Sequence, residues 1–171
     1  MTGLITPETL RFERRLAAPI ERVWQFLVDP ALRARWFMGG PTDLRVGGTI
    51  GMTMNHDRLS DTPVPTPDRY RAAVGHSWAE RIIRLEPPRL LAFTWDEGAA
   101  GEVTFELAED GRGTRLVLTH EGLRGLEDAT NFGGGWHSHL AVLERRVRGE
   151  DVADFWALHA AEGEAMRAAL G

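Results

Sequence analysis

The histidines in the second half of the chain are the side chains best suited to chemistry. His120 follows Leu116 and Leu118 at alternate positions, and this spacing places all three on one face of a β-strand. A neutral imidazole on the inner face of a sheet can orient the carbonyl group of a ligand or act as a general base. It can equally be a buried group that hydrogen-bonds to the neighbouring backbone or to Glu121. Both interpretations stay open here.

His137 and His139 are separated only by Ser138, a spacing that suggests a metal site at first sight. On a helix, however, residues i and i+2 point about 160° apart, so these two imidazoles cannot bind one ion. A third ligand would have to come from His56 or His120, and no carboxylate spacing supports such a site. We therefore expect no metal and no cofactor. His139 leans toward the apolar side of its helix, as a single polar contact in a cavity, and His137 leans away.

These histidines lie on a predicted helix over residues 131–147. Its apolar residues recur at spacings of three and four and form one stripe, made of Phe132, Trp136, Leu140, Leu143 and Val147. Three successive glycines, 133–135, stand near its start, although a glycine inside a helix costs about 1 kcal/mol relative to alanine. They indicate either a hinge over a cavity mouth or a close backbone contact with Trp36 or Trp95.

The stretch from residue 9 to residue 121 mostly shows the alternation of β-strands, interrupted by a helical pair near its start. Ile20, Val23, Trp24 and Leu27 recur at helical spacing, and Asp29-Pro30 can begin a short second helix. The predicted strands, of which the second and third form a hairpin at 47–48, are 10–16, 42–46, 49–55, 78–85, 90–95, 102–107 and 114–121. Short turns between the later strands indicate an antiparallel meander.

The segment 58–77 interrupts this pattern. Pro63, Pro65 and Pro67 stand at alternate positions, which predicts a loop or extended coil. Loops of this length are uncommon unless they are functional or mobile. The segment is either a lid or an insertion.

Composition narrows the class of protein. The chain has 171 residues, a net charge of −5 and no cluster of Lys and Arg, so nucleic acid is not an expected partner. No run approaches the ~18 apolar residues of a membrane span, and the first residues lack the pattern of a signal peptide. The absence of cysteine excludes disulfides and thiolate chemistry. We expect a cytoplasmic protein with one domain at 1–149 and a helical tail at 150–171, packed on the body or on the partner of a homodimer.

Several motifs in a specific order resemble a known family. They are APIERVW at 18–24, DP at 29–30, WF at 36–37, EPPRLLAFTW at 86–95, VTFEL at 103–107, GTRL at 113–116, THEGL at 119–123 and GW at 135–136. The chain resembles the START-like superfamily (SRPBCC, the helix-grip fold), and within it the branch named after the activator of the heat-shock protein 90 ATPase, in its C-terminal-domain-like form. The resemblance spans residues 9–148, and its motifs are mainly packing and turn positions.

The resemblance implies an α+β helix-grip fold, in which a curved antiparallel sheet wraps around a long C-terminal helix and a helical pair follows the first strand. It also implies a hydrophobic cavity between sheet and helix, near the glycine-rich start of the helix. The expected ligand-binding residues are Trp36, Phe37, Met52, Met54, Phe93, Trp95, His120, Phe132, Trp136 and His139.

The expected function is the binding of a small hydrophobic or aromatic ligand, without established catalysis. One alternative is an enzyme of the cyclase or dehydratase type, for which His120 and His139 are the candidate catalytic residues. The other is a chaperone-interaction module that activates the heat-shock protein 90 ATPase through an exposed apolar patch around Phe155 and Trp156. Fold alone does not choose between them.

Overall fold

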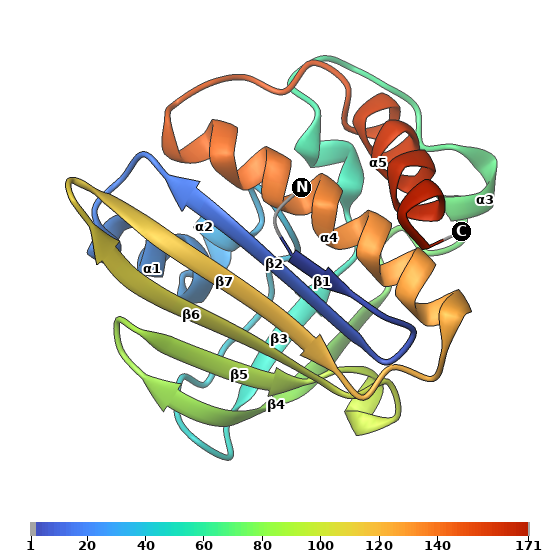
Figure 1. The fold of residues 1–171 in the computed structure, drawn as a ribbon. Coiled ribbons are helices and arrows are strands. Elements are labelled where there is room, and N and C mark those ends of the chain that lie inside the picture. The colour runs from blue at the N-terminus through green and yellow to red at the C-terminus, as the bar shows by residue number, and fades with distance from the viewer. Residues whose placement is uncertain (1–2, 171) are drawn as a thin grey trace.

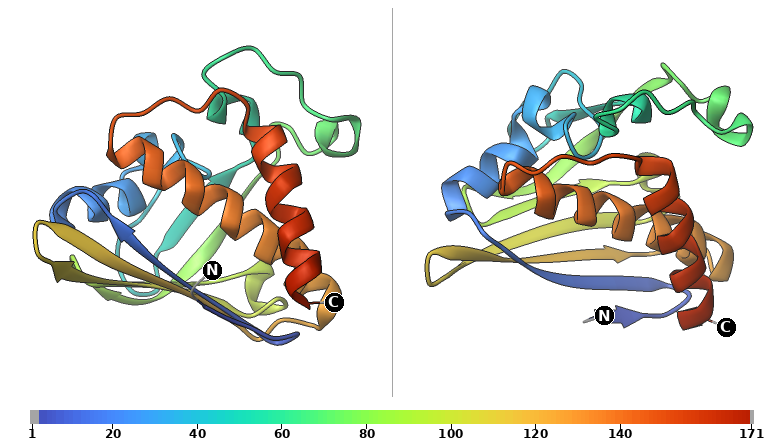
Figure 2. Two further views of the ribbon diagram at one scale, coloured as in Figure 1. Left: turned by 45° about the horizontal axis from the view of Figure 1, so that its top comes forward. Right: turned by 90° about the horizontal axis from the view of Figure 1, so that it is seen from above.

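The computed structural model describes residues 3–170 as one curved antiparallel sheet that wraps around a long helix (Figures 1 and 2). The strands lie in the order β1-β2-β7-β6-β5-β4-β3. They are β1 Gly3–Ile5, β2 Thr9–Leu16, β3 Thr49–Thr53, β4 Ser77–Glu86, β5 Leu90–Thr94, β6 Glu102–Asp110 and β7 Gly113–Glu121. The helices are α1 Ile20–Val28, α2 Pro30–Arg33, α3 Asp68–Arg71, α4 Leu126–Val147 and α5 Phe155–Leu170, with 3₁₀ turns η1 His56–Leu59 and η2 Asp96–Gly98. The predicted helix-grip fold is confirmed.

Alternating apolar residues build the inner face of the sheet. Leu10 and Phe12 of β2 pair with His120 and Leu118 of β7, and all four side chains are fully buried. Because successive residues of a strand point to opposite faces, this register directs the apolar set toward α4. The sequence missed β1, a three-residue strand that pairs with β2 at the edge of the sheet.

The predicted strand at 42–46, and with it the hairpin at 47–48, is wrong. Pairing here is limited to two isolated bridges, Gly39 with Thr53 and Thr42 with Ile50. The reason is a buried arginine, Arg33, with an exposed fraction of 2%. Its guanidinium donates to six oxygen atoms, which are the carbonyl oxygens of Leu27, Val28, Met38, Gly40 and Gly51 and the hydroxyl of Thr42. Two of these acceptors, the carbonyl oxygens of Gly40 and Gly51, belong to the facing segments, so the guanidinium there takes the place of regular ladder bonds.

Helix α4 begins at Leu126, five residues before the predicted start, and the three glycines lie inside it. A methyl group added at Gly133 would lie 2.9 Å from Sδ of Met166, and one at Gly134 would lie 3.2 Å from Cα of Gly163. Gly133 and Gly134 therefore make close contacts, but with α5, so the predicted partners Trp36 and Trp95 are wrong. A hinge at these glycines stays a prediction. Gly135 differs, since a methyl group there would meet no atom within 4 Å.

The segment 58–77 carries more structure than the predicted coil, because η1 ends and α3 lies within it. An ion pair of the buried Arg146 anchors its start, where Nη1 of Arg146 lies 2.7 Å from Oδ2 of Asp61. The same arginine donates to the carbonyl of Leu59, and the backbone N–H of Val152 donates to Asp61. These contacts join the segment to α4 and to the start of the tail, so that it lies over one end of the molecule.

Alanine substitutions at the adjacent positions Gly134 and Gly135 of α4 should change the free energy of unfolding in opposite directions. Gly135→Ala should raise the free energy of unfolding by up to about 1 kcal/mol, because alanine favours the helix and meets no obstacle. Gly134→Ala should lower it by roughly 1–3 kcal/mol, because the methyl group presses on the backbone of Gly163. Urea unfolding of both variants checks this pair, and equal effects of the two substitutions would contradict the assigned contacts.

Replacing Arg33 with an uncharged side chain should cause a large loss of stability. Arg33→Met should lower the free energy of unfolding by at least about 3 kcal/mol, because several buried oxygens lose their donor. Arg15→Met is the matched control, since the Arg15 side chain is 70% exposed and pairs with Asp110 at the surface. That control should change stability by no more than about 0.5 kcal/mol. Similar losses in the two variants would refute the role given to Arg33.

Candidate functional site

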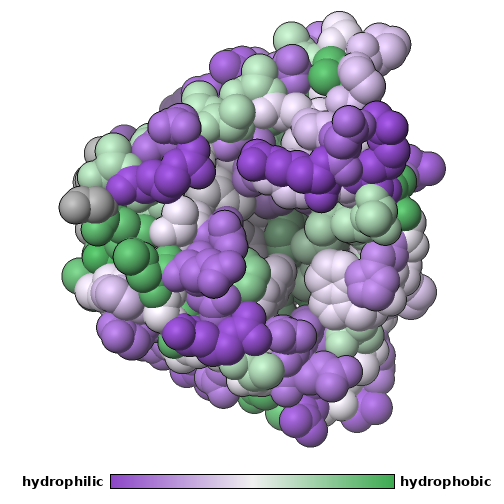
Figure 3. All heavy atoms as spheres, turned by 90° about the vertical axis from the view of Figure 1, so that its right-hand side faces the viewer, coloured by the Kyte–Doolittle hydropathy of each residue, from purple (hydrophilic) through white to green (hydrophobic). Residues whose placement is uncertain are grey.

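An open pocket of about 1110 Å³ lies beside the first half of α4. Its walls come from the ends of β4 and β5, from α4 and α5, and from residues between 54 and 78. Figure 3 shows the hollow on this face, with hydrophilic residues around it and more hydrophobic ones deeper in. Ligand sites commonly measure ~300–1,000 Å³, so the volume suits a molecule of several rings.

Aromatic rings form one continuous wall of this pocket. The ring of Trp95 lies 5.5 Å from that of Trp136 and 5.8 Å from that of Phe132, measured between centroids. Phe37 lies 5.0 Å from Trp136 and thus links the α2 region to α4. Rings at these separations pack favourably with one another and offer a planar ligand both faces and edges.

Gly135 stands at the centre of the pocket-facing side of α4. Asn131, Phe132 and His139 lie one turn away from it, and all of them line the pocket together with Trp136. Because glycine has no side chain, the pocket extends to the helix backbone at this point. This explains the third glycine, which makes no close contact with α5.

The structure brings six of the ten predicted ligand-binding residues together at the pocket. These six are Phe37, Met54, Trp95, Phe132, Trp136 and His139. The other four, Trp36, Met52, Phe93 and His120, are buried beside or behind the wall and do not line it. Period-two spacing shows which residues face inward, but it does not show which of them other side chains cover. A role in ligand binding stays a prediction for all ten.

His120 uses both of its ring nitrogens inside the protein. Nε2 donates to the carbonyl of Ala100 at 2.8 Å, and Nδ1 accepts from Nε1 of Trp136 at 3.1 Å. Burial lowers the pKa of His120, so the ring is neutral near pH 7. Of the two interpretations of His120, the structure thus shows the buried group that is hydrogen-bonded to the neighbouring backbone. Its bond to Trp136 holds that indole in the pocket wall.

His139 has one nitrogen engaged by the backbone. Nδ1 lies 2.8 Å from the carbonyl oxygen of Trp36, which can only accept, so Nδ1 carries the proton. Burial, and then the neighbouring His56, hold the pKa of His139 well below its ordinary value. The neutral ring therefore has its lone pair on Nε2, in a residue that lines the pocket.

Two further histidines, His56 and His159, join His139 at this end of the pocket, and we call the three the histidine cluster. The rings of His56 and His139 meet edge to face at 4.8 Å. Burial, with His159 as the second cause, lowers the pKa of His56 to about 4. His159 donates from Nδ1 to the hydroxyl of Ser138 and accepts from the hydroxyl of Tyr70. No local pattern marks His56 or His159, because their segments meet only in the tertiary structure.

His137, which was predicted to lean away from the apolar stripe, is nevertheless buried, with an exposed fraction of 7%. Nδ1 accepts from Nη2 of Arg14 at 3.0 Å, and the ring packs on Phe12 at 4.7 Å. It is buried because α4 is covered on two sides, by the sheet and by α5, whereas one apolar stripe suggests one covered side. Burial, followed by Arg14, lowers the pKa of His137 to about 4.

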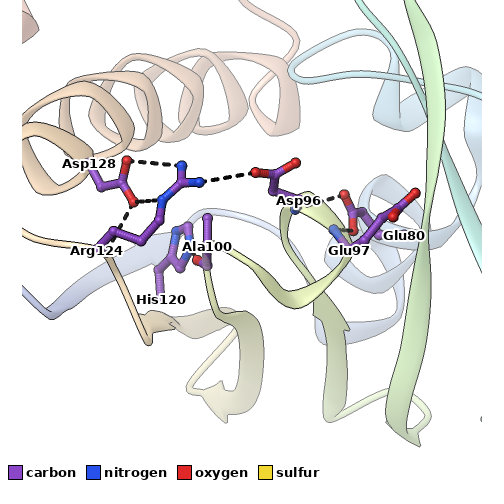
Figure 4. A network of polar contacts seen from close by, with 7 residues as sticks. All are labelled: Glu80, Asp96, Glu97, Ala100, His120, Arg124 and Asp128. Carbon is purple, nitrogen blue, oxygen red and sulfur yellow. Dashed lines mark hydrogen bonds and ion pairs between the residues drawn. The ribbon is translucent and has the colours of Figure 1, made fainter.

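A buried carboxylate, Glu80, organises the other side of the pocket (Figure 4). Its exposed fraction is 1%, and it accepts four hydrogen bonds, from Thr94, from Trp78 and from the backbone N–H groups of Asp96 and Glu97. Asp96 and Glu97 both have positive φ, near 52° and 54°, so their N–H groups converge on the carboxylate.

Arg124 extends this network to α4, because it contacts both Asp96 and Asp128. The sequence gives no local signal for Glu80, which resembles any other charged residue of a strand.

The same part of the chain, residues 3–170, holds no group of three or more histidines and carboxylates that could bind a metal ion. Within these residues no helix is both long enough and apolar enough to cross a membrane.

Comparison with known proteins gives one family and several solved structures. Residues 17–148 match the model of the family described as Activator of Hsp90 ATPase homolog 1-like protein. The chain is 38% identical to protein BPP1335 from Bordetella parapertussis, with a TM-score of 0.80 and coverage of 98% of this chain and 94% of that one. It is 25% identical to CalU16 from Micromonospora echinospora, with a TM-score of 0.71 and coverage of 98% and 96%.

The Aha1 dimer from Colwellia psychrerythraea is 16% identical, with a TM-score of 0.61 and coverage of 81% and 95%, and shows the fold alone. A search of curated proteins finds no match.

The buried imidazole of His56 predicts a loss of stability in mild acid. The unfolded chain takes up a proton at His56 below a pKa near 6.5, whereas the folded chain does so only near 4. The neutral imidazole of His56 therefore makes its full contribution to the free energy of unfolding above pH 6.5. This contribution is lost as the pH falls toward 4, because the unfolded state then binds a proton that the folded state does not. Between pH 7 and pH 5 the free energy of unfolding of the native protein should fall by about 2 kcal/mol more than that of His56→Phe. Urea titrations at the two pH values measure this, and parallel losses would rule out a buried neutral His56.

Proposed function

Because the chain belongs to the family of activator of Hsp90 ATPase homolog 1-like proteins, as its motifs predict, we propose that it binds a small hydrophobic or aromatic molecule in the pocket beside α4. The observation that carries the proposal is the pocket itself, about 1110 Å³ in volume and lined by aromatic rings from separate elements. Such rings provide most of the affinity for apolar ligands, and a few polar groups set the orientation.

The charged groups of the pocket support an uncharged ligand. The carboxylate of Glu80 already accepts four hydrogen bonds, which use its lone-pair positions. The three imidazoles of the histidine cluster are neutral because burial lowers the pKa of each. Burying a charged ligand beside these groups would cost solvation energy, because the Glu80 carboxylate is already saturated with donors and the buried imidazoles are neutral.

We propose binding rather than catalysis. An acid–base pair of His120 and His139 is not part of the proposal, because both nitrogens of His120 are hydrogen-bonded and the residue does not line the pocket. The chaperone-interaction alternative expected an exposed apolar patch at Phe155 and Trp156. These side chains are buried, and they pack on His56 and His139 of the same chain. A homodimer stays a prediction that needs a different surface.

The proposal predicts that a side chain placed at Gly135 blocks the pocket. Gly135→Phe should weaken binding of N-phenyl-1-naphthylamine, a neutral fluorescent probe, at least tenfold, because the ring enters open space at the centre of the pocket wall. Gly135→Ala should weaken it less. The rise in probe fluorescence and the quenching of tryptophan emission measure the affinity.

Arg145→Phe is the matched control, since it adds the same ring to an exposed position of the same helix. That variant should bind the probe like the native protein. Equal binding by Gly135→Phe, or no saturable binding by the native protein, would overturn the proposed function.

A further inference from the structure

We propose that the histidine cluster makes one end of the pocket a hydrogen-bond acceptor, so that the ligand is an aromatic molecule with a hydroxyl group that donates to Nε2 of His139. The inference rests on the proposed function and names the chemical class of the ligand.

The direction of the lone pair follows from the geometry around His139. The carbonyl of Trp36 accepts from Nδ1 at 2.8 Å, and a neutral imidazole with its proton on Nδ1 can only accept at Nε2. Nε2 has no hydrogen-bond partner among residues 3–170, and the ring lines the pocket with an exposed fraction of 6%. An acceptor in this position is satisfied when a ligand places an O–H group against it.

The neighbouring rings make this acceptor specific to His139. Both nitrogens of His159 are engaged, by Ser138 and by Tyr70, so that imidazole offers no free position. His56 packs edge to face on His139, and its Nδ1 is buried without a hydrogen-bond partner in the part of the chain that the structure describes. Nε1 of Trp156 is likewise buried without a partner in these residues, so this end of the pocket holds unmatched polar nitrogens, of which Nε2 of His139 is the acceptor in the pocket lining.

The surroundings favour a neutral hydroxyl on an aromatic ring. Phe155 lies beside His139 with ring centroids 5.3 Å apart, and Phe37 meets its edge at 4.9 Å. A phenolate or carboxylate would be buried next to a lone pair, and the arginines that line the pocket, Arg69 and Arg167, are exposed residues. A ring that enters along Trp95 and Trp136 would bring its hydroxyl toward His139.

A matched pair of probes tests the inference directly. The native protein should bind 2-naphthol about three- to tenfold more tightly than 2-methoxynaphthalene, which has the same rings and no donor, because one neutral hydrogen bond contributes about that factor. Isothermal titration calorimetry gives both dissociation constants. Equal affinities of the two probes would overturn the inference and leave the proposed function intact, whereas binding of neither probe would overturn both.

Substitution of His139 locates the acceptor. Asparagine can place an N–H group near the position of Nδ1 and keep the bond to Trp36, while it removes Nε2. In His139→Asn the ratio of the two dissociation constants should fall to about one. In His139→Gln, whose side-chain oxygen can reach the position of Nε2, part of the preference should return.

His137→Asn is the control, because it makes the same change two residues away, outside the pocket lining, and asparagine can still accept from Arg14. It should keep the native ratio, and thermal melting checks that every variant is folded. A ratio that is unchanged in a folded His139→Asn would overturn the assignment to His139. If that variant does not fold, the comparison of the two probes on the native protein still decides the inference.

Discussion

The close approach of α4 and α5 is the constraint on which the pocket depends. At Gly133 and Gly134 the helices are so near that an added methyl group would lie 2.9 to 3.2 Å from atoms of α5. This approach brings His159 within hydrogen-bonding distance of Ser138, and His159 in turn binds Tyr70, a lining residue from segment 58–77. The close contact of Gly134 with Gly163 therefore fixes the position of the pocket wall at Tyr70, which is distant from both glycines in the sequence.

Hydrogen bonds inside the protein then hold the aromatic rings in place. Trp136 donates to His120, and Trp78 donates to Glu80, so that each indole has a fixed orientation. The turn at Asp96 and Glu97 adopts positive φ at two residues that are not glycine, which costs of order 1–3 kcal/mol each. The hydrogen bonds of their N–H groups to the buried carboxylate offset this cost, because an unpaired carboxylate in the interior would be far more costly.

Local patterns in the sequence predicted the elements that repeat regularly. The alternation along β2 and β7 predicted the burial of His120, and the stripe along α4 predicted Phe132 and Trp136 on its covered side. Patterns failed where one side chain replaces regular pairing, as Arg33 does near residues 40–51. They also failed where distant segments meet, because no periodicity relates Glu80 or His159 to the pocket that they line.

Two kinds of buried polar group line the pocket, and each is stabilised in a different way. Glu80 is surrounded by four donors. The imidazoles of the histidine cluster are neutral mainly because burial lowers the pKa of each. His159 adds to this effect at His56, both of them add to it at His139, and Arg69 adds to it at His159. The cluster therefore offers polar atoms without the solvation cost of an ion. An apolar pocket can in this way discriminate between ligands of the same shape, because a buried acceptor left without a donor costs about 1–3 kcal/mol.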